Sequence, residues 1–195
     1  MAKKGFLLVL MQPPPAFEEE FNAWYDTEHI PERLAVPGFE TGLRFVNVSG
    51  AAPRYLAIYD LASPEVLRSE AYLRVAFDRS SPWTKRVTSR VRVWRYSGEQ
   101  VHPGDRVTGP CARLTLLRFR EAGTGAVPAV VAGMRTVFGE RPETRQVRVL
   151  AGEGGAKADV FGIVEARAPS AEGFDPTAFG AAADTLDLVN IYAPW

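Results

Sequence analysis

The order of secondary structure elements constrains this chain most, because the same order is predicted twice. Hydrophobic periodicity and turn residues predict a strand, a helix, two strands, a helix and a strand within residues 1–97, and the same six elements within residues 111–195. Residues 98–110, rich in glycine, proline and polar side chains, are expected to be a linker. The predicted fold class is therefore α+β, with two tandem ferredoxin-like βαββαβ repeats, the second one degenerate.

Turn and capping residues set the boundaries expected in the first repeat. Three prolines end the apolar run that forms the first strand, and Ser63-Pro64-Glu65 has the composition of a helix start. Pro31 is expected to interrupt the first helix near His29, because the residue before a proline avoids helical angles. The expected elements are strand 6–11, a helix from 16, strands 39–48 and 54–61, a helix over 63–75 and strand 90–96.

The second repeat is predicted from the same signals. Its expected elements are strand 112–120, helix 127–138, strands 145–150 and 159–166, a weak helix over 174–183 and strand 186–192. A four-stranded sheet with helices on one face leaves its other face bare, and two such sheets can cover each other. We therefore expect the two sheets to pack face to face as an intrachain dimeric α+β barrel.

Charge and cysteine content exclude several classes of protein. Twenty-three basic residues balance 23 acidic ones, so no charge excess favours nucleic acid or an anionic membrane. The apolar run over residues 6–11 is too short for a secretion signal. Cys111 is the single cysteine, which excludes cysteine-rich metal sites and fits a reducing compartment, so we expect a cytoplasmic protein. Pairing into a homodimer through outer surfaces stays open.

The segment Phe21–Leu34, which reads FNAWYDTEHIPERL, is followed by Val36-Pro37-Gly38-Phe39. This motif resembles the first helix of EthD-like proteins, a family of the dimeric α+β barrel superfamily. The resemblance covers about the first hundred residues, and the second half, which contains no histidine, carries no copy of the motif. It implies a fold in which two such units pair. Family members include lactone isomerases, polyketide oxygenases and cyclases, and many proteins without a known activity.

His29 is the main catalytic candidate. Histidine titrates near neutral pH and can act as a general acid or base. Asp26, three residues earlier, is expected to orient the ring, and Tyr25 could donate a hydrogen bond to a developing oxyanion. The alternative is that His29 caps the C-terminus of its helix, where a cation favours the helix dipole.

Three further residues are candidates for binding a ligand. Arg44 and Tyr59 lie on predicted strands, where an arginine could hold an anionic or carbonyl-bearing ligand. The alternative for Arg44 is a charge that faces solvent and pairs with a neighbour. Trp24 lies on the apolar stripe of the first helix, either as core or as a platform for a ligand.

The function expected from these residues is that of a small-molecule enzyme of the isomerase, oxygenase or cyclase type. His29 would move a proton of a small apolar ring or lactone compound, with no cofactor and no metal. The alternative is a non-catalytic ligand-binding or stress-related barrel protein. Neither expectation includes a nucleic-acid or membrane partner.

Overall fold

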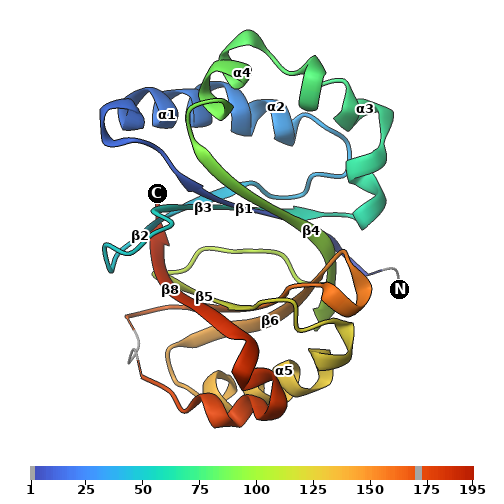
Figure 1. Ribbon diagram of the computed structural model, residues 1–195, viewed down its shortest axis with the longest axis vertical. Helices are drawn as coiled ribbons and strands as arrows, with labels where there is room; N and C mark the ends of the chain where they lie inside the picture. Colours follow the sequence, from blue (N-terminus) through green and yellow to red (C-terminus); the bar gives the residue numbers. More distant parts are fainter. Residues whose placement is uncertain (1–2, 170–172) are drawn as a thin grey trace.

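Eight antiparallel strands close into one barrel in the computed structural model, which describes residues 3–169 and 173–195 (Figure 1). The strands are β1 (Gly5–Gln12), β2 (Leu43–Asn47), β3 (Tyr55–Leu61), β4 (Arg92–His102), β5 (Arg113–Phe119), β6 (Thr144–Gly152), β7 (Val160–Ala166) and β8 (Leu186–Pro194). Their order around the barrel is β1-β3-β2-β8-β5-β7-β6-β4. The expected α+β barrel is confirmed.

Each half of the chain contributes one continuous half of the barrel. β4, β1, β3 and β2 are neighbours in the first half, and β8, β5, β7 and β6 are neighbours in the second. The halves join along two seams, where β2 pairs with β8 and β4 pairs with β6. The sheets thus also hydrogen-bond edge to edge, in addition to the face-to-face packing expected from the sequence, and closure removes exposed strand edges.

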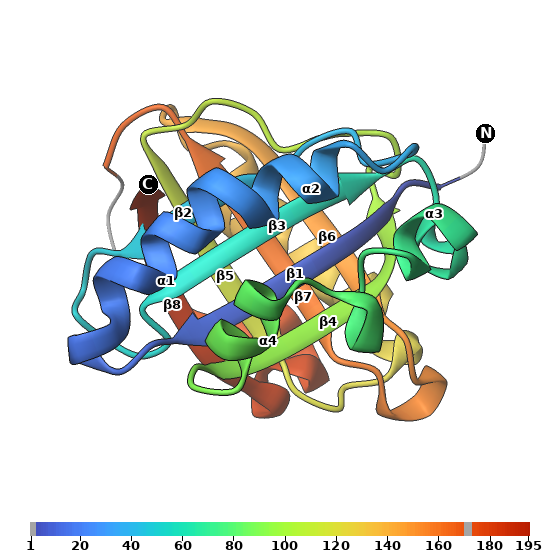
Figure 2. The same cartoon turned by 90° about the horizontal axis from the view of Figure 1, so that it is seen from above.

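Helices cover the outside of the barrel on two opposite sides (Figures 1 and 2). The first half carries α1 (Glu18–Trp24), α2 (Ile30–Leu34), α3 (Glu70–Leu73) and α4 (Pro82–Thr88), and the second carries α5 (Val127–Met134). A 3₁₀ helix over Pro176–Thr185 lies beside α5, in the region expected to be a weak helix. Among the described residues, none of the helices is long and apolar enough to cross a membrane.

The first helix does not break at Pro31. Tyr25–His29 forms a π-helical turn between α1 and α2, and the amide of Ile30 donates to the carbonyl of Tyr25, five residues back. A proline inside a helix lacks a donor and clashes with the preceding turn. The wider turn before Pro31 opens the hydrogen-bond ladder there, so the helix continues to Leu34.

Two strands differ in length from expectation. β2 is only five residues long, because the chain before it makes a turn and pairs through a single bridge from Phe39 to Leu61. β4 runs on to His102, so the start of the expected linker 98–110 is strand that pairs with β6. Glycine tolerates this pairing: a Cβ on Gly98 would lie 2.0 Å from the carbonyl oxygen of Ala151.

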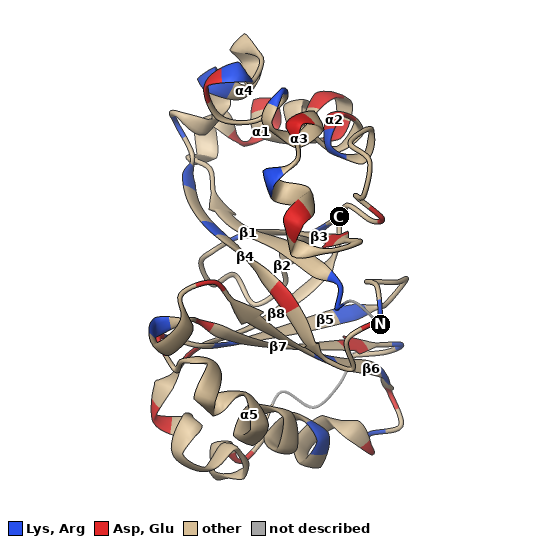
Figure 3. Cartoon of the chain, turned by 90° about the vertical axis from the view of Figure 1, so that its right-hand side faces the viewer, with Lys and Arg blue, Asp and Glu red and all other residues tan. Residues whose placement is uncertain are grey.

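Three apolar cores follow from the alternation of side chains along the strands. One fills the barrel interior, with Leu8, Leu56, Leu116 and Phe161 among its fully buried members. The other two lie between the barrel and the helices of each half. Positions of basic and acidic residues both occur along the helices of the two layers in Figure 3, in keeping with the net charge of zero.

One end of the barrel interior holds buried charges. Arg148, which is 0% exposed, donates to Asp60 at 2.6 Å and lies 3.3 Å from Glu165. Arg148 also donates to the Thr108 hydroxyl, and the Gly109 amide donates to Glu165 at 3.1 Å. The connection between the halves therefore adds hydrogen bonds to a buried ion-paired cluster at this end of the barrel.

Candidate functional site

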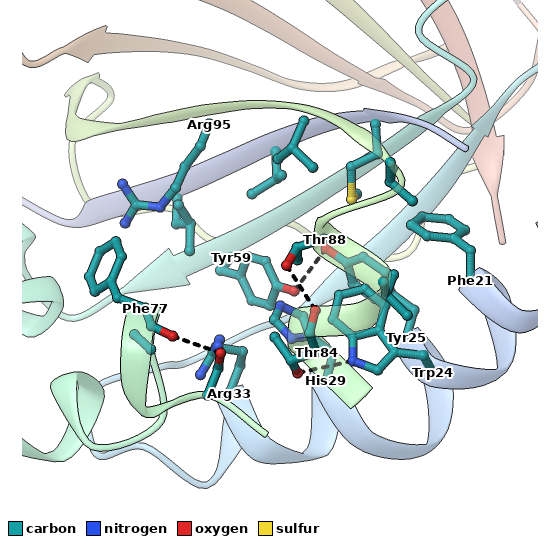
Figure 4. A pocket seen from close by; sticks show the side chains of 18 of the residues that line it. Phe21, Trp24, Tyr25, His29, Arg33, Tyr59, Phe77, Thr84, Thr88 and Arg95 are labelled. Carbon is teal, nitrogen blue, oxygen red and sulfur yellow. Dashed lines mark hydrogen bonds between the residues drawn. The ribbon is translucent and has the colours of Figure 1, made fainter. Parts of the chain in front are cut away.

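A cavity of about 240 Å³ lies between the helices of the first half and the outer face of its sheet (Figure 4). Leu7, Val9 and Met11 of β1 form its floor together with Tyr59 of β3. The α1–α2 helix and α4 form its walls. The lining is mainly apolar with a few polar groups, which is the usual composition of a small-ligand site.

His29 lies at the centre of this lining (Figure 4). Its ring centroid is 4.4 Å from the Trp24 ring and 5.0 Å from the Tyr25 ring. Its Nδ1 atom is buried and has no hydrogen-bond partner among the described residues. Burial, with the nearby Arg33 and Arg44 guanidinium groups, lowers the pKa of His29 well below 6.5, so the imidazole is neutral at physiological pH.

The position of His29 rules out the helix-capping alternative. The helix continues for five residues after His29 and ends at Leu34. A charged histidine stabilises a helix only in its last turn, and His29 is both neutral and inside the helix. The side chain therefore faces the cavity as an unprotonated, unpaired base.

Two tyrosine hydroxyls meet beside the imidazole. Tyr59 donates to the Tyr25 hydroxyl at 3.2 Å, and both side chains are 1% exposed. Burial raises the pKa of Tyr25 to about 12 and raises that of Tyr59 well above 10, so both phenols keep their protons. Because Tyr59 donates, the Tyr25 proton is available to a ligand oxygen.

Trp24 holds the cavity wall in place. Its indole Nε1 donates to the Thr84 hydroxyl of α4 at 3.0 Å. Thr84 in turn donates to Glu28 at 3.2 Å, and Ser81, the N-cap of α4, donates to the same carboxylate oxygen. Glu28 therefore points to α4 rather than into the apolar core, and these bonds fix α4 against the first helix.

Asp26 is a correction to the predicted site. Its carboxylate, about half exposed, accepts from Arg44 and from the Trp195 indole, 3.2 Å away, so among the described residues it does not orient His29. The π turn explains the difference. It contains more residues per turn than an α-helix, so the side chains of Asp26 and His29, three residues apart, do not lie on the same face.

Arg44 lies outside this cavity and lines a second pocket together with Asp26 and Trp195. It is held by Asp26 and Asn22, with its guanidinium 4.5 Å from the Tyr25 ring centroid. Its charge is therefore paired within the protein. It affects His29 only through the electrostatic repulsion that helps to lower the pKa of His29. This matches the alternative in which Arg44 pairs with a neighbour, although the side chain is buried.

The cavity also contains residues that the sequence did not single out. Arg33, expected to be separated from His29 by the Pro31 break, lies one turn further along the same continuous helix. Arg95 of β4 and Phe77 stand at one end of the cavity in Figure 4. Whether such a residue lines the cavity depends on which face of its strand or loop packs against the helices. The sequence does not indicate that face.

The second half differs at the corresponding place. It also has a π-helical turn after its first helix, Arg135–Gly139, but the last position of that turn is Gly139 where the first half has His29. Its helix α5 approaches the barrel closely, since a Cβ on Gly162 of β7 would lie 2.5 Å from the Met134 Sδ atom. The imidazole and its cavity thus belong to the first half.

No protein-family model matches the sequence, and no curated protein matches it either. Solved structures do. An anthrone oxidase-like protein aligns with a TM-score of 0.71 at 14% identity, over 100% of this chain and 92% of the other. The chain shares the fold of that protein, a mixed α+β fold with a closed antiparallel barrel.

More distant structures share this fold. A mutant chlorite dismutase from Candidatus Nitrospira defluvii aligns at a TM-score of 0.58 and 5% identity, over 98% of this chain and 90% of the other. A heme-binding protein from Thermus thermophilus aligns at 0.52 and 8%, over 100% and 92%. At such identities the likeness concerns the fold alone.

The haem-binding neighbour makes it necessary to test the cavity for a haem. An axial histidine would need open space for the macrocycle in front of its ring nitrogen. The cavity holds about 240 Å³, and the Trp24 and Tyr25 rings stand 4.4 and 5.0 Å from the imidazole. A porphyrin does not fit there. In the described part of the chain, no group of three or more histidine, cysteine or acidic residues could hold a metal ion.

Proposed function

We propose that this protein is a small-molecule enzyme in which His29 takes a proton from an apolar ring compound bound in the cavity. The observation that carries the proposal is a neutral imidazole in the lining of an apolar cavity, with a buried Nδ1 atom that has no partner among the described residues. A buried polar atom without a partner costs free energy unless a ligand or a reaction uses it. Such atoms are therefore candidates for functional groups.

The proton transfer is balanced within the site. The unprotonated ring nitrogen of His29 accepts a proton from a carbon next to a carbonyl, and the electron pair of the broken C–H bond moves into an enolate. The Tyr25 hydroxyl, which keeps its proton, donates to the enolate oxygen. In an isomerisation, His29 returns the proton to another carbon of the substrate, and no co-reactant is needed.

Oxygenation would begin with the same proton transfer and then consume dioxygen. The anthrone oxidase-like neighbour suggests anthrone as a probe. Its ring CH₂ would become a ketone, with one oxygen atom of O₂ entering the product and the other leaving as water. The carbanion supplies the electrons, so the chain itself needs no redox group.

Deuterium exchange separates proton abstraction from later chemistry. We would measure exchange into anthrone, 2-tetralone and an unsaturated γ-lactone in D₂O under nitrogen by NMR. At least one compound should exchange faster with protein than in buffer, and His29→Gln should lower that rate about 100-fold or more. His102→Gln is the matched control, because His102 lies outside the cavity lining.

Two results would contradict the enzyme. Exchange at the buffer rate with all three compounds would, if they bind, favour a non-catalytic ligand-binding or stress-related barrel. An unchanged rate in His29→Gln would remove His29 from the reaction. Air-saturated assays that measure O₂ uptake and anthraquinone then distinguish oxygenation from isomerisation.

We also infer that residues 1–97 form a ferredoxin-like repeat with an EthD-like motif and that residues 111–195 form a second, degenerate ferredoxin-like repeat. In each half the first strand lies between the third and fourth strands of that half, which supports a common plan. The short π turn after the first helix of each half supports it as well.

A further inference from the structure

The charged groups that line the cavity are all basic. In the described part of the chain, the lining includes the charged Arg33 and Arg95 and the neutral His29 but no aspartate or glutamate. The nearest carboxylates lie outside it. Glu32 is 3.4 Å from the Arg33 Nη1 atom, and Glu28 accepts hydrogen bonds from α4. A ligand in the cavity therefore meets two guanidinium groups, of which Arg33 is paired with a carboxylate outside the lining and Arg95 is exposed.

Arg33 is buried with an incomplete set of hydrogen bonds. Its side chain is 5% exposed, its Nη2 donates to the Val75 carbonyl at 2.9 Å, and its guanidinium lies 5.5 Å from the Tyr72 ring centroid. Its Nη1 has no hydrogen-bond partner among the described residues. A buried guanidinium usually uses its donors on acceptors fixed by the protein or by a ligand.

The charges are arranged along the cavity. Figure 4 shows Arg33, Arg95 and Phe77 at one end, Phe21 and Trp24 at the other, and His29 between them. Arg95 is exposed and donates to the Tyr72 hydroxyl at 3.3 Å, so the basic end also faces the solvent. A ligand with one anionic and one apolar end would match this arrangement.

We propose that the cavity selects aromatic compounds that carry a carboxylate or a phenolate. The anionic oxygens lie between Arg33 and Arg95, and the ring lies against Trp24, which places the ring carbons beside His29. This inference deepens the proposed function of His29 and rests on it for the reactive step. The selection of an anionic ligand is measurable without any turnover.

A matched pair of ligands tests the charge. We would titrate the full chain with 1-naphthoate and with 1-naphthamide, which has a similar shape but no charge, and follow binding by calorimetry. Naphthoate should bind about tenfold more tightly or better, because charge-assisted hydrogen bonds are stronger than neutral ones. The advantage should shrink as salt is added, since Arg95 is exposed.

Arg95→Gln carries the mutational test, because a substitution of the buried Arg33 would also test folding. The variant should lose most of the naphthoate advantage and leave naphthamide binding unchanged. Arg92→Gln is the control. Arg92 is an exposed arginine of the same strand that stacks over Trp94 at 4.9 Å and lies outside the cavity lining.

The inference and the proposed function fail separately. Equal affinity for the two ligands, no saturable binding of either, or an unchanged preference in Arg95→Gln overturns the inference, even if exchange still depends on His29. A clear naphthoate preference that Arg95→Gln removes supports the inference, even if His29→Gln leaves exchange untouched and the proposed function fails.

Discussion

At the scale of the residue, the properties of His29 come from burial. The ring packs between Trp24 and Tyr25, and its Nδ1 is shielded from solvent without a partner. The positive charges of Arg33 and Arg44 disfavour its protonated form further. The same environment that makes the imidazole a neutral base also links the stability of the protein to pH.

We expect stability to fall as the pH is lowered through the ordinary histidine range. Because the folded-state pKa of His29 lies well below 6.5, the unfolded chain binds more protons between that lowered value and 6.5. The free energy of unfolding therefore rises with pH in this window, by up to about 1.4 kcal/mol per pH unit for one group, and levels off above it. Urea unfolding at pH 5, 6 and 7 would measure it.

His29→Gln should reduce this slope. His102→Gln is the control, since His102 is only partly buried and its pKa is lowered less strongly. An equal slope in wild type and His29→Gln would show that the His29 ring is hydrated in the folded protein.

At the scale of the element, α4 gives the cavity one of its walls. It supplies Thr84, Val87 and Thr88 to the lining but is only seven residues long. Helices this short have little stability of their own. Contacts to the first helix therefore decide its position, and the Ser81 cap is the contact most accessible to experiment.

Ser81→Ala should destabilise the protein by about 1–2 kcal/mol and weaken ligand binding. The Ser81 hydroxyl accepts from the Thr84 amide at 2.9 Å and donates to Glu28, and alanine removes both bonds. Thermal unfolding and naphthoate titration would measure the two effects.

Ser89→Ala, at the other end of α4, is the control. Its hydroxyl is exposed and donates only to the Arg86 carbonyl, so we expect a change within about 0.5 kcal/mol. Equal effects of the two substitutions would contradict the role of the Ser81–Glu28 contact.

At the scale of the whole molecule, closure of the barrel joins the halves. The seam of β4 with β6 starts at Gly98 and Gly152, and the buried Arg148, Asp60 and Glu165 lie at one end of the interior. The cavity of the first half lies against strands of the barrel, and the strands of the second half close that barrel. Weakening the seam should therefore unfold both halves together.

Gly98→Ala should cost about 3 kcal/mol or more. A Cβ there would lie 2.0 Å from the Ala151 carbonyl oxygen, and backbone cannot move aside as a side chain can. Chemical denaturation followed by tryptophan fluorescence would report mainly the first half, which contains Trp24, Trp83 and Trp94 and against whose Tyr55 the Trp195 ring packs. Far-UV circular dichroism would report the whole chain.

Gly125→Ala is the control, because a Cβ at Gly125 meets nothing within 4 Å. Its midpoint should stay close to that of wild type. Two separate transitions in Gly98→Ala would show that the halves fold independently of the seam.

Much of the fold could be predicted from local pattern. Strand alternation and the proline stop after β1 are local signals, so the order of the strands was correct. The helix expected over 63–75 is instead a 3₁₀ turn over Pro64–Arg68 followed by α3, and Ser63 makes no side-chain capping hydrogen bond. Helix α4 was not predicted. The π turn before Pro31 and the length of β4 were not predicted, because both depend on hydrogen bonds to distant or less common partners. Of the residues that line the cavity, the sequence singled out only His29, Tyr25, Tyr59 and Trp24.

The sequence alone determined which residue types lie on the first helix and that two similar halves follow one another, because helix and strand periods are properties of neighbouring residues. Only the tertiary structure decided that Asp26 and Arg44 bind each other, while Arg33 and Arg95 share the cavity with His29. These pairings depend on how far the π turn rotates the side chains of the first helix, and on which faces of distant strands point toward that helix. A small shift in either changes which charges meet, and no local pattern encodes it.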